Sequence, residues 1–234
     1  MMLNQMQKKI SPIWTWNQFA ITMVLLFGVT PLLIEQHLHN FLERSWGNTL
    51  YSGTSIGLLL AIIFMTVLYL VAIRPRTLSL ETLGLRRISW KDSGMIFLWT
   101  IVLIVLSIII VVVQSYFSIG TSNTKTESLQ SDLSIISILI AFGSAAIISP
   151  FYEEIFYRGF LYRFFQERFG VWIGMLISAG IFTLAHLPTT NTLLVNFVSG
   201  LVFAWVYERT NSIYSSMLIH GTFNGLAVLL TALA

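Results

Sequence analysis

Four long stretches of the chain contain no charged residue, and they limit the fold more than any other feature. No Asp, Glu, Lys or Arg occurs in residues 45–73, 93–124, 133–152 or 169–207. Each stretch is long enough to hold a transmembrane helix, because roughly 20 apolar residues cross the hydrocarbon core of a bilayer. Only 10% of the 234 residues are charged, whereas soluble domains average about a quarter. These features exclude an ordinary soluble enzyme.

The gaps between charged residues predict an all-α fold, a polytopic membrane bundle of about seven transmembrane helices. We expect one integral-membrane domain over residues 1–234, with loops at about residues 35–54, 74–93 and 114–132. A secretory signal peptide is disfavoured for the first apolar run, because no small-x-small cleavage site follows Leu33. The expected spans lie at about residues 18–34, 55–73 and 94–113, from 133 into the charged cluster after Pro150, and at about 171–187, 192–207 and 212–232.

The basic residues predict the orientation, because loops rich in Lys and Arg stay on the cytoplasmic side. With the N-terminus inside, ten basic residues are cytoplasmic and only Arg44 and Lys125 lie outside. We therefore expect a multi-pass protein of the cell membrane with a cytoplasmic N-terminus and an external C-terminus. The basic residues form no continuous face, so the net charge of +3 does not indicate a nucleic-acid partner. The ten are Lys8, Lys9, Arg74, Arg76, Arg86, Arg87, Lys91, Arg163, Arg168 and Arg209.

The second half of the chain carries ionisable side chains inside its predicted spans, where a charge costs roughly 2.5–3.5 kcal/mol. Glu154 and Arg158 are four residues apart, so they share a helix face and can form an ion pair. Glu153 is rotated by about 100° from Glu154 and is left free of that pair. His220 and Asn224 are also four residues apart and can point to one place.

The spacing also places Glu153 and His186 at the same depth. A turn at residues 169–170 makes the two flanking helices antiparallel, and both residues then lie 16–17 positions from it, or about 25 Å. His220 lies about ten residues, roughly 15 Å, from a turn near residues 210–211. It is at the same depth as Glu153 and His186 if the hairpin with its turn at residues 169–170 extends about 10 Å further into the cytoplasm. We therefore expect three helices to converge on one pocket.

Two further features bear on the packing around this pocket. Pro150 lies three residues before Glu153 and is expected to loosen its helix and to free carbonyl groups beside the site. Small residues four apart, such as Gly221 and Gly225, let membrane helices approach closely.

This set of residues fits hydrolysis. Glu153 can remove a proton from a water molecule that His186 orients, while His220 and Asn224 donate hydrogen bonds to the resulting oxyanion. Alternatively, Glu153, His186 and His220 can bind a divalent metal such as zinc, and the residue types do not separate the two versions. Cysteine-nucleophile, aspartate-dyad and H-E-x-x-H protease chemistries are excluded, because the chain has no cysteine, no aspartate inside a span and no H-E-x-x-H motif.

At these residues the sequence resembles the CPBP family of intramembrane proteases, also called Abi, which joins CAAX prenyl endopeptidases with bacteriocin-processing enzymes. The family's E-E-x-x-x-R motif matches residues 153–158, its F-x-x-x-H motif matches residues 182–186, and its H-x-x-x-N motif matches residues 220–224. The motifs occur in the family's order within residues 133–234, which the resemblance marks as the catalytic core region.

The resemblance implies a CAAX-prenyl-protease-like fold that cleaves a peptide bond at a pocket open to the cytoplasmic side. It leaves zinc and a metal-free mechanism equally open. The short loops resemble the bacterial branch, whose roles are bacteriocin maturation, self-immunity and peptide-signal processing. The implied partners are a peptide or protein substrate at the membrane and the lipid bilayer. The family roles fall on Glu153 and His186 for water activation, on His220 and Asn224 for oxyanion stabilisation, and on Glu154 and Arg158 for support.

Two rival functions use the same residues. A non-catalytic immunity or scaffold protein would bind a peptide or a partner helix in the same cavity. A small transporter would use Glu153 and Arg158 as a gated ion pair, although the sequence has no internal inverted repeat. Each polar residue taken alone also has a structural explanation, such as a Glu154–Arg158 ion pair. Their convergence is what favours a shared functional site.

Overall fold

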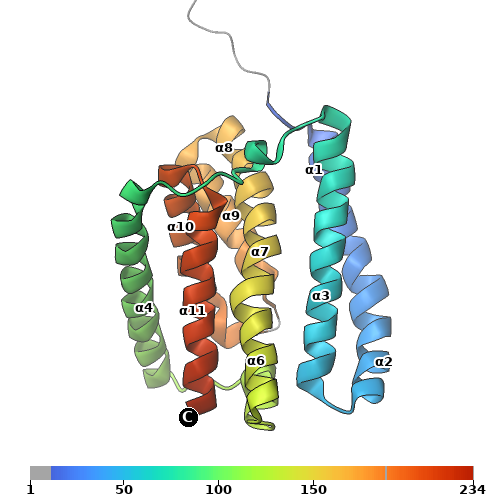
Figure 1. The fold of residues 1–234 in the computed structure, drawn as a ribbon, viewed down its shortest axis with the longest axis vertical. Coiled ribbons are helices and arrows are strands. Elements are labelled where there is room, and N and C mark those ends of the chain that lie inside the picture. The colour runs from blue at the N-terminus through green and yellow to red at the C-terminus, as the bar shows by residue number, and fades with distance from the viewer. Residues whose placement is uncertain (1–11, 188, 234) are drawn as a thin grey trace, which may run out of the picture.

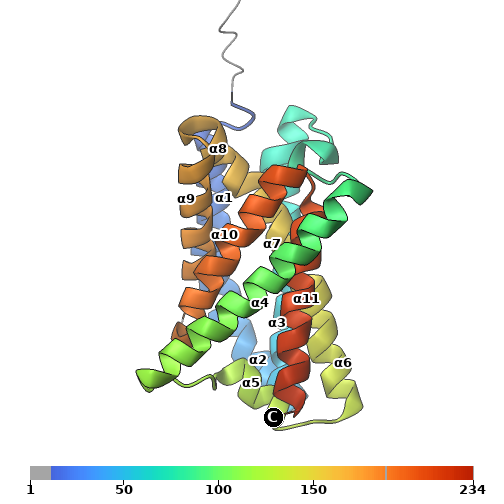
Figure 2. The ribbon, with the colours of Figure 1, turned by 90° about the vertical axis from the view of Figure 1, so that its left-hand side faces the viewer.

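Helices dominate the computed structural model, which describes residues 12–187 and 189–233 (Figure 1). No strand occurs among these residues, so the expected all-α class is confirmed. The long helices run roughly along one axis of the bundle, and the helix labelled α4 crosses it obliquely (Figure 2).

The first half of the chain forms three long helical segments. α1 (Trp16–Met23) continues through the π-helical turns η1 (Val24–Val29) and η2 (Pro31–Glu35) into α2 (Gln36–Trp46). α3 (Thr49–Leu68) continues through η3 (Tyr69–Ile73). Three 3-10 turns, η4 (Arg74–Arg76), η5 (Leu80–Leu83) and η6 (Trp90–Asp92), lead to α4 (Ser93–Tyr116).

The second half begins with the short helix α5 (Thr124–Gln130). A helical run then combines α6 (Ile135–Gly143), η7 (Ser144–Ile148), α7 (Ser149–Glu154), η8 (Ile155–Tyr162) and α8 (Arg163–Phe169). The chain ends with α9 (Val171–Leu184), the turn η9 (Thr190–Thr192), α10 (Leu193–Thr210) and α11 (Ile213–Leu233).

Five helical segments among the described residues are long and apolar enough to cross a membrane. Two shorter apolar helices, Trp16–Val29 and Val171–Leu184, stand where the first and fifth spans were expected. The 14 residues of α9 rise only about 21 Å, and Figure 2 shows the α9–α10 turn stopping short of the lower ends of α6 and α11. The five are Thr49–Arg76, Trp90–Tyr116, Ile135–Phe169, Thr190–Thr210 and Ile213–Leu233.

Two of the expected loops are partly helical. The prediction of a loop at residues 35–54 was wrong, because α2 occupies most of this segment and α3 starts at Thr49. The Asn48 side chain accepts hydrogen bonds from the Leu50 and Tyr51 amides, and this N-cap fixes the early start of α3. The loop expected at residues 114–132 holds α5. Gaps between charged residues reveal apolar runs only, so polar helices such as α2 and α5 were missed.

The helical run that carries Glu153 and Glu154 in α7 continues directly into η8, which lies at the centre of the bundle. Every residue of η8 is buried. Its Phe156 ring contacts Phe27 and Phe64 from η1 and α3, at centroid distances of 5.8 and 5.2 Å. α9, α10 and α11 also pack against η8. Side chains on this segment therefore face other helices rather than lipid.

Small residues bring the surrounding helices close together, as expected. A Cβ atom on Gly200 of α10 would lie 3.0 Å from the Ala179 Cα of α9. A Cβ atom on Gly221 of α11 would collide with the carbonyl oxygen of Ala146 in η7. These pairs of helices therefore meet at backbone distance, which only small residues permit.

Candidate active site

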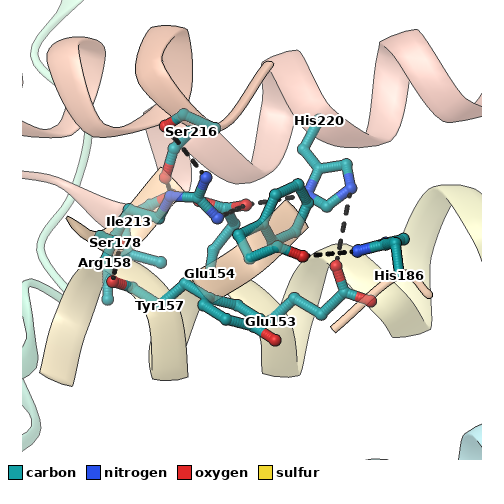
Figure 3. A network of polar contacts seen from close by, with 11 residues as sticks. Glu153, Glu154, Tyr157, Arg158, Ser178, His186, Ile213, Ser216 and His220 are labelled. Carbon is teal, nitrogen blue, oxygen red and sulfur yellow. Dashed lines mark hydrogen bonds and ion pairs between the residues drawn. The ribbon is translucent and has the colours of Figure 1, made fainter. Parts of the chain in front are cut away.

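A buried network joins Glu154, Arg158 and His220 (Figure 3). Glu154 Oε1 accepts hydrogen bonds from Arg158 Nη1 at 2.9 Å and from His220 Nδ1 at 2.8 Å. Arg158 Nη2 also donates to the carbonyl oxygen of Gly200 at 3.1 Å, which links η8 to α10. The pairing of Glu154 with Arg158, predicted from their spacing, is confirmed. The bond from His220 to the same carboxylate was not predicted.

Aromatic rings enclose the charged centre. The Arg158 guanidinium carbon lies 4.8 Å from the Phe182 ring centroid and 5.0 Å from that of Phe203. Phe203 also stacks on the His220 imidazole, with centroids 4.6 Å apart and planes inclined by 19°. The rings exclude water and offer the cation favourable π-faces, so the geometry of Arg158 and His220 is held from several sides.

Glu153 stands beside this network without joining its hydrogen bonds. Its Oε2 atom lies 3.9 Å from His220 Nε2, which is too long for a hydrogen bond. That oxygen is buried and has no hydrogen-bond partner among the described residues. Glu153 is therefore the free carboxylate of the pair, as the helix geometry predicted.

His186 lies just beyond the C-terminal end of α9. Its Nδ1 bonds to the carbonyl oxygen of Phe182 at 2.8 Å, and since a carbonyl can only accept, Nδ1 carries the proton. The Phe182 ring centroid lies 4.6 Å from that of His186 and 6.0 Å from that of His220. Figure 3 shows the His186 ring next to the Glu153 carboxylate. The end of α9 thus meets α7 and α11 around one small volume.

Asn224 bonds elsewhere. Its Nδ2 donates to the carbonyl oxygen of Ala145 at 3.1 Å. In the π-helical register of η7, Ser149 N–H bonds to the carbonyl of Ser144, five residues earlier. The next bond of that register would run from Pro150 to Ala145, but proline has no N–H. Pro150 thus frees a carbonyl, as expected, and the amide of Asn224 satisfies it.

Two residues of the site were given no role by the sequence, although Phe182 is part of the F-x-x-x-H motif. Phe182 supplies the carbonyl that fixes His186 and a ring that contacts both imidazoles. The F-x-x-x-H spacing carries a signal for it, since the residue four positions earlier on a helix faces the same side. Phe203 stacks on His220 from α10, and no local pattern marks it among the other apolar residues of that helix.

The donor types suit a divalent metal better than their arrangement does. Both imidazoles hold Nδ1 against an oxygen acceptor and leave Nε2 for a further partner, as metal-ligating histidines do. However, the described part of the chain contains no group of three or more His, Cys, Asp or Glu side chains placed to hold a metal ion. In their present positions Glu153, His186 and His220 do not form a ready ligand set.

The fold and the site define this chain as a multi-pass membrane protein with a buried carboxylate–imidazole centre. Residues 135–226 match the family model described as type II CAAX prenyl endopeptidase Rce1-like, and this segment contains all three motifs. The resemblance to the CPBP (Abi) family is therefore confirmed over this segment.

Three curated relatives are distant, and their matches cover from a third to three quarters of the chain. The putative membrane peptidase YdiL of Bacillus subtilis is 29% identical over 180 residues, which cover 74% of this chain and 71% of that protein. UPF0177 protein YbdI of Lactococcus lactis is 28% identical over 78 residues, covering 33% of this chain and 41% of that protein. UPF0177 protein YxdF of the same species is 26% identical over 146 residues, covering 62% and 78%. No solved structure matches this one.

Proposed function

We propose that the chain is an endopeptidase that hydrolyses a peptide bond of a membrane-associated peptide or protein inside the bilayer. The observation that carries this proposal is the Glu153 carboxylate, whose buried Oε2 atom has no hydrogen-bond partner among the described residues, faces His220 Nε2 at 3.9 Å and stands next to His186. A carboxylate without a hydrogen-bond partner at membrane depth is costly and suggests a functional role. The family match and the name of the Bacillus relative support the same activity.

In the proposed mechanism Glu153 is the general base. It takes one proton from a water molecule while the unprotonated Nε2 of His186 accepts a hydrogen bond from the same water. The water oxygen forms a bond to the substrate carbonyl carbon, and the carbonyl oxygen becomes an oxyanion. The C–N bond then breaks as Glu153 passes its proton to the leaving nitrogen, which yields a carboxylic acid and an amine.

We assign oxyanion stabilisation to His220 and Asn224. Since His220 Nδ1 donates to Glu154, its Nε2 can donate only when the ring is protonated. Asn224 has two N–H groups, and only one is needed for Ala145. Donors of this kind typically lower a barrier by roughly 3–4 kcal/mol. Glu154 and Arg158 act by positioning His220.

A second version of the chemistry makes Glu153, His186 and His220 ligands of a divalent metal. Because these side chains are not placed as a ligand set, the proposed mechanism contains no step through a metal. Cleavage that is lost on chelation and restored by zinc would replace the metal-free mechanism with this second version. The metal content of the purified protein should be measured on the same samples.

The test of the proposed activity compares Glu153→Gln with wild type in proteoliposomes that contain membrane-associated peptides. The substitution keeps the shape of the side chain and removes the base. We expect cleavage, read as new peptide termini by mass spectrometry, to fall by about 10²–10⁴-fold. Glu81→Gln is the matched control, because Glu81 is an exposed carboxylate in η5. Undiminished cleavage by Glu153→Gln would reject the proposal.

The biological setting proposed for this activity is a bacterial cell membrane, in bacteriocin maturation, self-immunity or peptide-signal processing. The non-catalytic alternative, an immunity or scaffold protein, makes a different prediction. Protection of cells against a bacteriocin that persists in the double variant Glu153→Gln/His186→Ala would favour that binding role.

A further inference from the structure

An apolar groove lies on the outer side of the bundle, away from Glu153. Its volume is about 460 Å³, within the roughly 300–1,000 Å³ typical of small-molecule sites. α10 packs against both α4 and α9, and the groove is lined by side chains from all three helices. Trp99 of α4, Trp172 of α9 and Trp205 of α10 line it together with aliphatic residues.

Trp205 contacts both of the other tryptophans. The Trp172 and Trp205 rings stack with centroids 5.7 Å apart and planes inclined by 17°. Trp99 meets Trp205 edge to face at 6.4 Å. Trp172 is 68% exposed. In a membrane protein, an aromatic surface that is this exposed is expected to contact lipid.

A cation lies next to Trp205, one of the residues that line the groove. Arg209 lies one helical turn beyond Trp205, and its guanidinium carbon is 5.1 Å from the Trp205 ring centroid. The Arg209 side chain is exposed, and no carboxylate among the described residues lies within ion-pair distance of it. The apolar groove therefore has an uncompensated positive charge beside one of its lining tryptophans.

The position of the groove along the bundle fits a membrane interface. Trp99 is near the start of α4, Trp172 is at the start of α9, and Trp205 and Arg209 are in the last turns of α10. The starts of α4 and α9 and the end of α10 all lie at the upper side of the bundle in Figure 2, together with the turns η4 to η6. Tryptophan is enriched at the boundary between hydrocarbon and headgroups, and basic pockets between membrane helices bind anionic headgroups.

We infer that this groove binds an anionic phospholipid of the bilayer, with an acyl chain along the tryptophans and the phosphate on Arg209. The inference does not depend on the proposed peptidase activity. A free phosphate would use only the cation, whereas a phospholipid uses the cation and the apolar groove together.

The test measures thermal unfolding of the purified chain in neutral detergent with added phosphatidylglycerol or phosphatidylcholine of identical acyl chains. A ligand that binds only the folded state raises the melting temperature. We expect phosphatidylglycerol to raise it by a few degrees more than phosphatidylcholine does. Arg209→Gln should remove this difference, and Trp172→Leu should reduce the shift with both lipids. Arg87→Gln, which changes another exposed arginine at the same end, should keep the difference.

Three results would overturn the inference. The first is an undiminished preference for phosphatidylglycerol in Arg209→Gln. The second is an equal shift with inorganic phosphate alone, which would indicate an ion site without a lipid. The third is a stable dimer in light scattering that Trp172→Leu dissociates, since a second copy of the chain would then cover the groove. The melting temperature of each variant without added lipid shows whether it is folded.

Discussion

A single carboxylate connects the charged residues of the buried centre. Glu154 Oε1 accepts from both Arg158 and His220, and none of these three side chains is more than 4% exposed. Removing one partner of a buried ion pair costs roughly 3–5 kcal/mol, because the other charge is left without compensation. Replacing both partners by apolar groups often costs far less. We therefore propose that the pair fixes the position of His220 more than it stabilises the fold.

We predict that Glu154→Gln destabilises the protein by roughly 3–5 kcal/mol, and that Arg158→Met added to it restores part of the loss. Equilibrium unfolding in detergent of the two single variants and the double variant gives a coupling energy, which should be about 0.5–3 kcal/mol. The control Glu81→Gln should leave stability unchanged, because that side chain is exposed. Strictly additive losses would show that the contact contributes nothing specific.

The sequence reveals the polar residues of the centre but not all of their partners. Glu153, His186 and His220 stand out because lipid makes a charged or polar side chain costly. The bonds from His220 to Glu154 and from Asn224 to Ala145 depend on rotamers and on the π-helical register of η7. A π-helical turn shifts the phase of all later residues relative to a 3.6-residue helix, so an α-helical reading does not place them.

At the scale of elements, the contact of α11 with η7 positions two residues of the site. Gly221 follows His220 directly, and a Cβ atom there would collide with the Ala146 carbonyl oxygen. That carbonyl is next to the Ala145 carbonyl that Asn224 binds. The distance between the two helices is thus set by the absence of a side chain at one position.

We predict different effects for two glycine-to-alanine changes in membrane helices. Gly221→Ala should lower the melting temperature and the cleavage rate, because α11 must move away from η7. Gly143→Ala in α6 should leave stability unchanged or raise it by up to about 1 kcal/mol, because a Cβ atom there meets nothing within 4 Å and alanine favours helix. Thermal unfolding of both variants checks this, and equal destabilisation would contradict the packing argument.

Apolar elements were predictable from the sequence, whereas polar elements and exact helix ends were not. α4 (Ser93–Tyr116) and α11 (Ile213–Leu233) agree with the spans expected at residues 94–113 and 212–232 to within three residues. α3 begins earlier than expected, because the cap at Asn48 acts through local hydrogen bonds that hydropathy does not register. α9 begins at the expected Val171 and ends at Leu184, three residues before the expected end, because the apolar run continues past the helix.

At the scale of the whole molecule, the basic residues gather at one end of the bundle. The connection between η3 and α4, the helix α8 and the end of α10 lie at the upper end in Figure 2, and α2 and α5 lie at the lower end. Lys8 and Lys9, also expected at the basic end, lie outside the described residues. The described basic residues at the upper end are Arg74, Arg76, Arg86, Arg87, Lys91, Arg163, Arg168 and Arg209, and those at the lower end are Arg44 and Lys125.

This asymmetry predicts that the upper end faces the cytoplasm, because loops rich in Lys and Arg are retained there. The chain has no cysteine, so single cysteines can report on each end without background labelling. Thr121→Cys, in the exposed connection after α4, should react with a membrane-impermeant maleimide on intact cells. Arg87→Cys should react only after the membrane is permeabilised. The reverse pattern would place the basic end outside and would invert the side from which a substrate reaches Glu153.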